Sequence, residues 1–185
     1  MQERRIIKLA LTAAALASAL GLTIAGATAA SAAQSATSAA TAAHSAARPA
    51  AGTTYELTNR AHNLCLTAAA GGDGSNGDAV RLWHCYGGSN QHWHITNSEW
   101  VNGAHGLCLT AAAGGDGSNG DAVRLWHCYN GSNQHWVFTE TGELANGAHG
   151  LVLTAVAAHD GSNGDAVRLW GNYGGANQLW TYHLN

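Results

Sequence analysis

The sequence has no lysine after Lys8, and positive charge is sparse along the rest of the chain. Beyond the first 33 residues there are five basic residues, all arginine, against ten acidic ones, which leaves a formal net charge of −5 with histidine neutral. Binding to nucleic acid relies on clustered lysine and arginine that contact phosphates. We therefore expect no nucleic acid among the partners of this protein.

Long apolar runs are also absent, apart from one near the N-terminus. Residues 1–8 include three basic side chains and precede an apolar stretch over about 9–25, and small residues then lead to Ala32 and Ala33. This order is typical of a secretory signal peptide, which we assign to 1–33. A retained membrane anchor is the alternative, but the small-residue end fits it less well. We expect a secreted, extracellular product that leaves the membrane when the signal is cleaved.

Residues 34–52 contain almost only alanine, serine and threonine. Serine and threonine compete with the helical backbone for hydrogen bonds, and the segment has no apolar stripe that could pack against a core. We interpret it as a disordered linker. The remaining residues, 53–185, have a length that suits one domain.

That domain repeats one pattern three times, in units of about 53–96, 97–139 and 140–185. Near-copies occupy 64–83, 107–126 and 151–170, and each is followed by Asn-Gln-x-Trp. One unit is too short to bury a hydrophobic face alone, so the three units must share a core, and a site in one unit is built three times. Repetition favours multivalent binding over catalysis, because an active site usually joins different residues once.

Cysteine is limited to four residues, two in each of the first two units. The intervals from Cys65 to Cys85 and from Cys108 to Cys128 are equal, and the third unit has lost both cysteines together. We predict these two pairs as disulfides, each worth about 3 kcal/mol by loop closure. A zinc site that includes the neighbouring histidines is the alternative, but no C-x-x-C or H-x-x-H spacing supports it, and we expect no metal.

Helical periodicity is almost absent after the leader, whereas apolar and polar residues alternate over short runs. In the first unit this alternation predicts strands at about 55–59, 64–68, 79–85 and 93–96, and the other units repeat them. Twelve short strands in three similar units predict an all-β, closed or nearly closed structure with pseudo-threefold symmetry.

The predicted disulfide also suggests a register for the second and third strands. If Cys65 lies opposite Cys85, Thr67 lies near Trp83 and shares its face, while Leu64, Leu66, Val80 and Leu82 point into the core. Trp83 and its equivalents Trp126 and Trp170 then face away from the core. An outward aromatic beside polar groups is a candidate ligand platform.

Three Gln-x-Trp motifs lie in phase with the threefold period, at Gln91-His-Trp93, Gln134-His-Trp136 and Gln178-Leu-Trp180. Together with Arg-Leu-Trp-His-Cys85, they make the domain resemble the ricin B-type β-trefoil lectins, also called family 13 carbohydrate-binding modules. The resemblance covers nearly all of 53–185. It implies a β-trefoil of three pseudo-equivalent four-stranded repeats, in which three hairpins cap a six-stranded barrel and each unit has one sugar pocket.

The resemblance also implies roles for individual residues. It places the aromatic that stacks on the C–H face of a sugar at Trp83, Trp126 and Trp170. It assigns hydrogen bonds with sugar hydroxyls to Asn90, Asn133 and Asn177, because an amide offers a donor and an acceptor together. Rim contacts are expected from Tyr86, Tyr129 and Tyr173. The Gln and Trp of each Gln-x-Trp motif are expected to be structural.

All three units depart from the family pattern at two positions. The family usually has Asp two residues after the first cysteine, where this chain has Thr67, Thr110 and Thr154, and a hydroxyl makes weaker, neutral hydrogen bonds with sugar. The family often has Gln two residues before the stacking aromatic, where this chain has Arg81, Arg124 and Arg168. The units therefore share either an alternative pocket or a lost one. Arginine here suits acidic saccharides or pairs with a nearby Asp.

Two further motifs recur. The Asp-Gly-Ser-Asn-Gly-Asp loop at 73–78 returns at 116–121 and 160–165. One of its carboxylates replaces the missing Asp, or the loop is only a tight turn, which we favour for Asn76-Gly77. A calcium loop would space its carboxylates and glycine differently. Solvated turn histidines are expected at His62, His105 and His149.

These observations predict a monomeric carbohydrate-binding module without cofactor or catalysis, whose weak sites, up to three, act by avidity on a polysaccharide or glycan. The alternative is a β-trefoil scaffold that binds or inhibits a protein, its sugar sites having decayed. A secreted hydrolase ranks last, because the sequence has no G-x-S-x-G or H-E-x-x-H motif.

Overall fold

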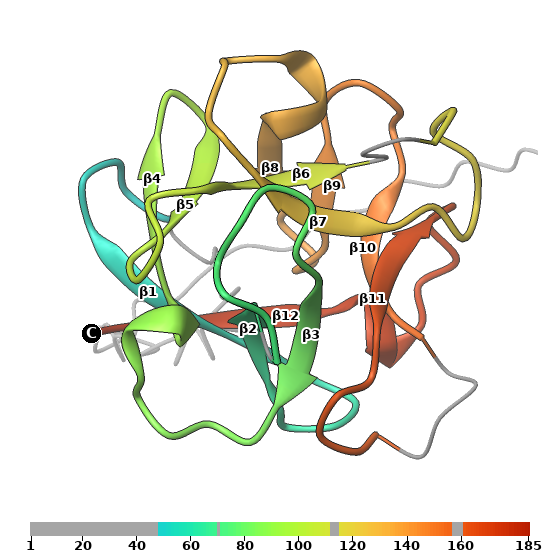
Figure 1. Cartoon of the computed structure of the whole chain (residues 1–185). Coiled ribbons are helices and arrows are strands. Elements are labelled where there is room, and N and C mark those ends of the chain that lie inside the picture. Colours follow the sequence, from blue (N-terminus) through green and yellow to red (C-terminus); the bar gives the residue numbers. More distant parts are fainter. Residues whose placement is uncertain (1–47, 70, 112–114, 157–160) are drawn as a thin grey trace, which may run out of the picture. The chain divides into compact units, whose positions relative to one another are not determined.

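The computed structural model describes residues 48–69, 71–111, 115–156 and 161–185, all within one compact unit of the chain (Figure 1). The predicted signal peptide, the linker up to residue 47 and Asp160 lie outside these ranges. Within them, no helix combines the length and the apolar character that a membrane span requires. The last linker residues contact the domain, since Ala50 N donates to Tyr55 Oη at 2.6 Å and Gly52 N donates to Ile95 O at 2.9 Å.

The described residues form twelve strands and three short 3-10 helices, so the four predicted strands per unit are confirmed. The first unit has β1 (Thr54–Asn59), β2 (Cys65–Ala68), β3 (Val80–Trp83), η1 (Ser89–Gln91) and β4 (His92–Thr96). The second has β5 (Glu99–Asn102), β6 (Cys108–Ala111), β7 (Val123–Trp126), η2 (Ser132–Gln134) and β8 (Trp136–Phe138). The third has β9 (Leu144–Asn146), β10 (Val152–Ala155), β11 (Val167–Trp170), η3 (Ala176–Gln178) and β12 (Trp180–Leu184).

Strand pairing divides these elements into a barrel and three hairpins. The hairpins are β2–β3, β6–β7 and β10–β11, each antiparallel. The barrel follows the order β1, β4, β5, β8, β9 and β12, and β12 returns to β1. Backbone hydrogen bonds from Trp136 N to Ser98 O and from Trp180 N to Gly142 O close the two remaining junctions. This is the β-trefoil that the resemblance implies, and closure leaves no unpaired edge in the barrel.

One core joins the three units, as their short length requires. Leucines from each hairpin are fully buried in it, and the tryptophans of the Gln-x-Trp motifs, Trp93, Trp136 and Trp180, are buried beside them. Each indole Nε1 donates to a leucine carbonyl of its own unit at 2.8–2.9 Å: Leu66, Leu109 and Leu153. The prediction that these tryptophans fill the core is therefore confirmed.

The register predicted for β2 and β3 is wrong by two residues. Cys65 lies opposite Trp83, and Thr67 lies opposite Arg81. A shift of two leaves every side chain on its predicted face, so Leu66 and Leu82 still point inward. Both predicted disulfides are confirmed, with Cα–Cα distances of 5.1 Å. The register prediction failed because β3 ends at Trp83, and Cys85 reaches Cys65 from beyond the ladder.

A hydrogen bond stands in the third unit where the others have a disulfide. Asn172, which replaces the second cysteine, donates from Nδ2 to Glu143 Oε1 at 3.1 Å. Glu143 is buried and also accepts hydrogen bonds from the hydroxyls of Thr139 and Thr141. Burial of Glu143 raises its pKa, but the hydrogen bonds from Thr139, Thr141 and Asn172 outweigh it, and the pKa lies below its ordinary value.

Glu143 should therefore make stability depend on pH in the acid range. Because the pKa of the folded state is depressed, the stabilisation is complete above the unfolded pKa of about 4.3 and is lost as the pH falls through the folded value. We expect the wild type to lose more stability than Glu143→Gln between about pH 5 and pH 3. Urea unfolding at each pH measures this. The exposed Glu140 supplies the control, and equal pH profiles for Glu143→Gln and Glu140→Gln would contradict the assignment.

The recurrent histidines are half-buried and lie across the boundaries between units, which corrects the expectation of solvated turn residues. A Cβ added to Gly74 would lie 2.0 Å from Nδ1 of His105 in the next unit. The same relation joins Gly117 to His149 and Gly161 to His62. Each imidazole therefore covers a glycine of the preceding loop, where no larger residue fits.

Candidate functional site

A hollow of about 380 Å³ lies on the outer side of the first hairpin, beside Trp83. It contains four side chains that the sequence nominated, Trp83, Tyr86, Asn90 and Thr67, and the structure therefore brings them together. Its complete lining is Thr67, Ala69, Gly71, Trp83, His84, Tyr86 and Asn90. The hollow is made within one unit, although its supports come from two.

Aromatic rings form one wall of this hollow. Trp83 is half-buried with its ring facing outward, as predicted, and its centroid lies 6.3 Å from that of His84. His84 lies 5.4 Å from Tyr86, whose side chain is 51% exposed. The second unit repeats the row with Trp126, His127 and Tyr129, at 6.2 and 5.5 Å. A row of tilted rings with polar edges suits a ligand that has one apolar face and many hydroxyls.

Two hydrogen bonds hold Asn90 in a fixed orientation beside the aromatic rings. Its Oδ1 accepts a hydrogen bond from Tyr86 Oη at 2.7 Å, and its Nδ2 donates to Ala68 O at 3.3 Å. An amide has two N–H groups and two lone pairs on oxygen, so one donor and one acceptor position remain for a ligand. Asn133 and Asn177 make the equivalent pairs of hydrogen bonds in their own units.

The buried glutamine of each Gln-x-Trp motif holds the loop beside the hollow through hydrogen bonds. Gln91 is fully buried, its Oε1 accepts from Tyr86 N and Gly87 N, and its Nε2 donates to His84 O and Thr67 Oγ1. The structural role expected for Gln91 is therefore confirmed. Gln91 fixes the loop that carries two of the three aromatic rings.

The threonines lie at the floor, and their hydroxyls are engaged within the protein. Thr67 is 1% exposed, donates to Cys65 O at 3.1 Å and accepts from Gln91 Nε2 at 2.9 Å. Thr110 and Thr154 make the same two bonds. These hydroxyls orient the glutamine, and their contact with sugar stays a prediction.

In the Asp-Gly-Ser-Asn-Gly-Asp loop at 73–78, both carboxylates accept hydrogen bonds from groups of the loop itself. Asp78 Oδ2 accepts from Gly74 N at 2.7 Å and from Ser75 N at 3.0 Å. Asp73 accepts from the hydroxyl and the backbone N–H of Ser75, and the hydroxyl is the main reason that its pKa is lowered. These bonds make the tight turn that the sequence favoured, and neither carboxylate lines the hollow.

Support from the neighbouring unit leaves no signal in the sequence. Asn163, in the loop of the third unit, accepts from His84 N through Oδ1 at 2.6 Å, and its Nδ2 lies 2.9 Å from His84 Nδ1. A Cβ placed on Gly164 would lie 3.6 Å from Cζ3 of Trp83, so the loop backbone flanks the indole. Asn76 makes the same two contacts with His127, and Asn119 accepts a hydrogen bond from Gly171 N through Oδ1. Each loop therefore positions the aromatic row of another unit.

The third unit has the least complete wall. Gly171 replaces the histidine of the row, so no imidazole follows Trp170, whose side chain is 39% exposed. Tyr173 keeps its hydrogen bond with Asn177 at 2.9 Å. The outward tryptophan, the tyrosine and the asparagine are thus present in all three units, but the histidine is present in two.

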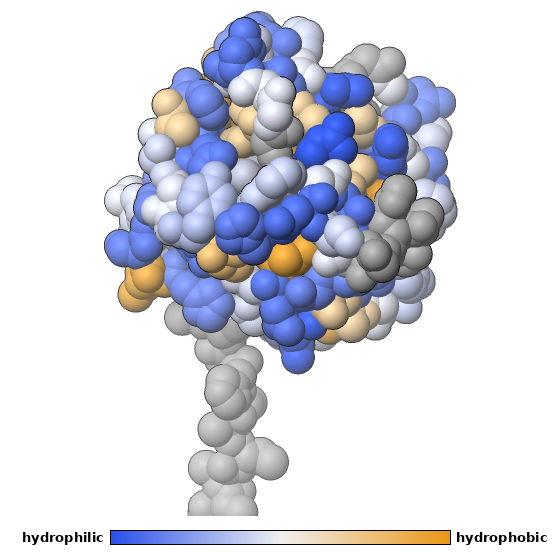
Figure 2. All heavy atoms as spheres, turned by 60° about the horizontal axis from the view of Figure 1, so that its bottom comes forward, coloured by the Kyte–Doolittle hydropathy of each residue, from blue (hydrophilic) through white to orange (hydrophobic). Residues whose placement is uncertain are grey.

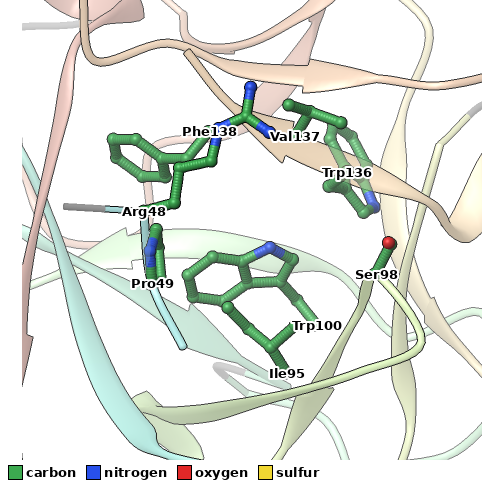
Figure 3. Close-up of a pocket in the computed structure, with 8 residues that line it drawn as sticks. All are labelled: Arg48, Pro49, Ile95, Ser98, Trp100, Trp136, Val137 and Phe138. Atoms are coloured by element: carbon green, nitrogen blue, oxygen red, sulfur yellow. The ribbon is translucent and has the colours of Figure 1, made fainter. Parts of the chain in front are cut away.

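Another hollow, of about 160 Å³, lies near the barrel strands and is a weaker candidate. In Figure 3, Arg48 and Pro49 lie along one side of it and Trp136 and Ser98 along the opposite side. Arg48 and Pro49 precede the repeats and have no counterpart in the other units. Few polar side chains line this hollow, whereas ligand sites need convergent polar groups.

The cysteines supply no metal site. Two clusters bring Glu56 near Cys65 and Cys85, and Glu99 near Cys108 and Cys128. All four sulfur atoms are in disulfides, and a cysteine binds a metal only as a free thiolate. The alternative of a zinc site at these cysteines is therefore excluded.

Comparisons with known proteins agree with this geometry. Residues 53–180 match the family described as the ricin-type beta-trefoil lectin domain. The designed threefold-symmetric protein ThreeFoil is 25% identical, with a TM-score of 0.64 over 70% of this chain and 96% of its own. A search of curated proteins found no match.

Two natural proteins are similar over a part of their length. A non-toxic homologue of type II RIPs from Momordica charantia is 26% identical, with a TM-score of 0.60 over 71% of this chain and 48% of its own. The agglutinin from Abrus precatorius is 23% identical, with a TM-score of 0.60 over 73% of this chain and 48% of its own. The chain thus spans about half the length of these two proteins, and the second comparison shows the fold alone.

Proposed function

Because the chain belongs, over residues 53–180, to the family of ricin-type beta-trefoil lectin domains, we propose that it is a secreted carbohydrate-binding module. Each unit contributes one weak site, and repetition gives avidity for a polysaccharide or a surface glycan. The observation that carries the proposal is the outward tryptophan beside an oriented asparagine, repeated in three units. The Momordica protein was solved in complex with α-methyl-D-galactoside, which supports a saccharide as the ligand class.

In the proposed pocket, an aromatic side chain stacks on the sugar and an amide makes hydrogen bonds with its hydroxyls. The indole of Trp83 covers the apolar face of a pyranose ring, and Tyr86 lies at the rim. The free donor and acceptor of Asn90 pair with two neighbouring hydroxyls, which removes the cost of desolvating them. A neutral, shallow site of this kind gains little binding free energy from one sugar, so a single unit binds weakly. The three units together bind a polymer because their sites act at the same time.

A glycan array and a polysaccharide pull-down test the proposal. The variant with Trp83, Trp126 and Trp170 all replaced by Ala should lose retention on every saccharide that the wild type binds. Leu184→Ala is the matched control, because Leu184 is an exposed apolar side chain that lines neither the hollow beside Trp83 nor the one beside Trp136. Unchanged retention of the triple variant would remove the stacking tryptophans from the proposal.

The second candidate function, a scaffold that binds or inhibits a protein, has less support. The face shown in Figure 2 is mainly hydrophilic, and its hydrophobic residues form small, separate patches. Protein-binding surfaces usually present a larger contiguous apolar patch. Failure of the wild type to bind any saccharide, with specific capture of a protein partner, would favour this candidate. We propose no catalysis, because the recurring residues act as turn, core or pocket elements.

The third site should contribute less than the other two. Trp170→Ala is expected to weaken retention on a polysaccharide less than Trp83→Ala or Trp126→Ala, because Gly171 leaves its aromatic wall incomplete. Surface plasmon resonance with immobilised polysaccharide ranks the three single variants. A larger loss for Trp170→Ala than for either of the others would contradict this ranking.

A further inference from the structure

Three arginines, one from each unit, surround the pseudo-threefold axis. The strands that carry them, β3, β7 and β11, contact one another and lie near the middle of the view in Figure 1. Backbone hydrogen bonds of 2.8–2.9 Å run in a circle through these strands, as from Leu82 N to Asp165 O and from Leu125 N to Asp78 O. Bridges pair Arg81 with Ala166, Arg124 with Ala79 and Arg168 with Ala122.

Arg81, Arg124 and Arg168 line one small hollow together with alanine and valine residues of the same strands. The hollow has a volume of about 100 Å³. Water occupies about 30 Å³ per molecule in the liquid, so this space equals about three waters. It is therefore far smaller than the hollow beside Trp83, and it suits one small group instead of a sugar ring.

Backbone carbonyls of neighbouring units hold the three guanidinium groups. Arg81 Nη1 donates to Gly164 O at 2.9 Å, and the other two donate to Gly77 O and Gly120 O at 2.9 and 3.0 Å. A guanidinium has five N–H donors, so each arginine keeps further donors. Of the two options from the sequence, a nearby Asp or an acidic saccharide, the first does not describe these contacts, because the partners are backbone carbonyls.

None of the residues that the structure places around this hollow is a carboxylate, so nothing in its lining balances the three positive charges. The carboxylate of Asp78, whose backbone lies nearby, binds Gly74 N and Ser75 N in its own loop. Three half-buried cations around one hollow repel one another. An anion between them would attract all three and offset this repulsion.

We propose that this hollow binds one tetrahedral oxyanion, phosphate or sulfate, either free or as an ester group on a polysaccharide. The fork of N–H donors on a guanidinium matches such oxygens. Three equivalent arginines match the three oxygens that share one face of a tetrahedral group. The site is separate from the sugar pockets and does not rest on the proposed function.

Thermal unfolding in inorganic phosphate or sulfate, against chloride at equal ionic strength, tests the site. An anion that binds only the folded state raises the Tm, and we expect a rise of about 4 °C or more in the wild type. The rise should shrink in Arg124→Gln and vanish in the triple variant R81Q/R124Q/R168Q. Arg60→Gln, which removes an exposed charge outside the hollow, should behave as the wild type.

Titration calorimetry of the wild type and Arg124→Gln with phosphate gives a second readout that needs no triple variant. One anion per wild-type chain, bound at least tenfold more weakly by Arg124→Gln, supports the site. Equal Tm shifts for chloride and phosphate, or equal binding by Arg124→Gln and Arg60→Gln, would overturn it. Selective retention on dextran sulfate over dextran, lost in Arg124→Gln, identifies an ester group as the ligand. Phosphate binding in calorimetry without such retention identifies the free ion.

Discussion

Replacing Gln134 with alanine is expected to lower the free energy of unfolding by about 3–5 kcal/mol. Gln134 is fully buried, accepts from Tyr129 N at 2.8 Å and donates to Thr110 Oγ1 and His127 O at 2.9 Å. The alanine variant leaves these polar groups without their partner, and each buried unsatisfied group costs about 1–3 kcal/mol. A cavity adds to the loss. Urea unfolding measures the difference as a lower midpoint at constant slope.

Ser132→Ala is the matched control for Gln134→Ala, because Ser132 lies in the same 3-10 helix with an exposed side chain. It should change stability by less than about 0.5 kcal/mol. A loss below about 1 kcal/mol for Gln134→Ala would show that water or other groups satisfy the loop, and that the motif glutamine does not hold it.

Removing two of the three sites is expected to weaken retention on a polysaccharide by about 10²–10⁴-fold. The double variant Trp126→Ala/Trp170→Ala keeps the first pocket intact, and its affinity for a short oligosaccharide should equal that of the wild-type first site. Only the avidity is lost, because the remaining pocket can no longer hold the polymer while another rebinds. Parallel binding to immobilised polymer and to a free oligosaccharide separates the two effects.

Equal losses on the polymer and on the short oligosaccharide would contradict the avidity argument, because they would mean that the pockets do not act independently. Retention of polymer binding by the double variant would show that the first site alone is sufficient. The Leu184→Ala control should change neither measurement.

The fold could be predicted well from the sequence because the same pattern of apolar and polar residues occurs in all three units. Alternation placed Leu66 and Leu82 inside and Trp83 outside, and the loss of both cysteines from one unit identified the disulfide pairs. The register of β2 and β3 could not be predicted, because a disulfide of this geometry also forms when one cysteine lies beyond the end of its strand. The 3-10 helices were missed because a three-residue segment, Ser-Asn-Gln or Ala-Asn-Gln, is too short to show helical periodicity.

Contacts between units were the main part that sequence reasoning could not reach. A period of about 43 residues shows what each unit contains but not which neighbour each loop touches. Asn163 therefore looked like an ordinary turn residue, although it binds His84 of another unit. Arg81 was recognised as a departure, but its partner, the carbonyl of Gly164, carries no sequence signal because every residue has a backbone carbonyl.

Indole N–H signals in an NMR titration test the central claim most directly, since the chain has seven tryptophans. A saccharide found on the glycan array should shift the signals of the three outward rings, Trp83, Trp126 and Trp170. The signals of the four buried rings, Trp93, Trp100, Trp136 and Trp180, should stay unchanged. Saccharide binding that leaves the three outward signals in place, or that shifts Trp100 and Trp136 instead, would contradict the account.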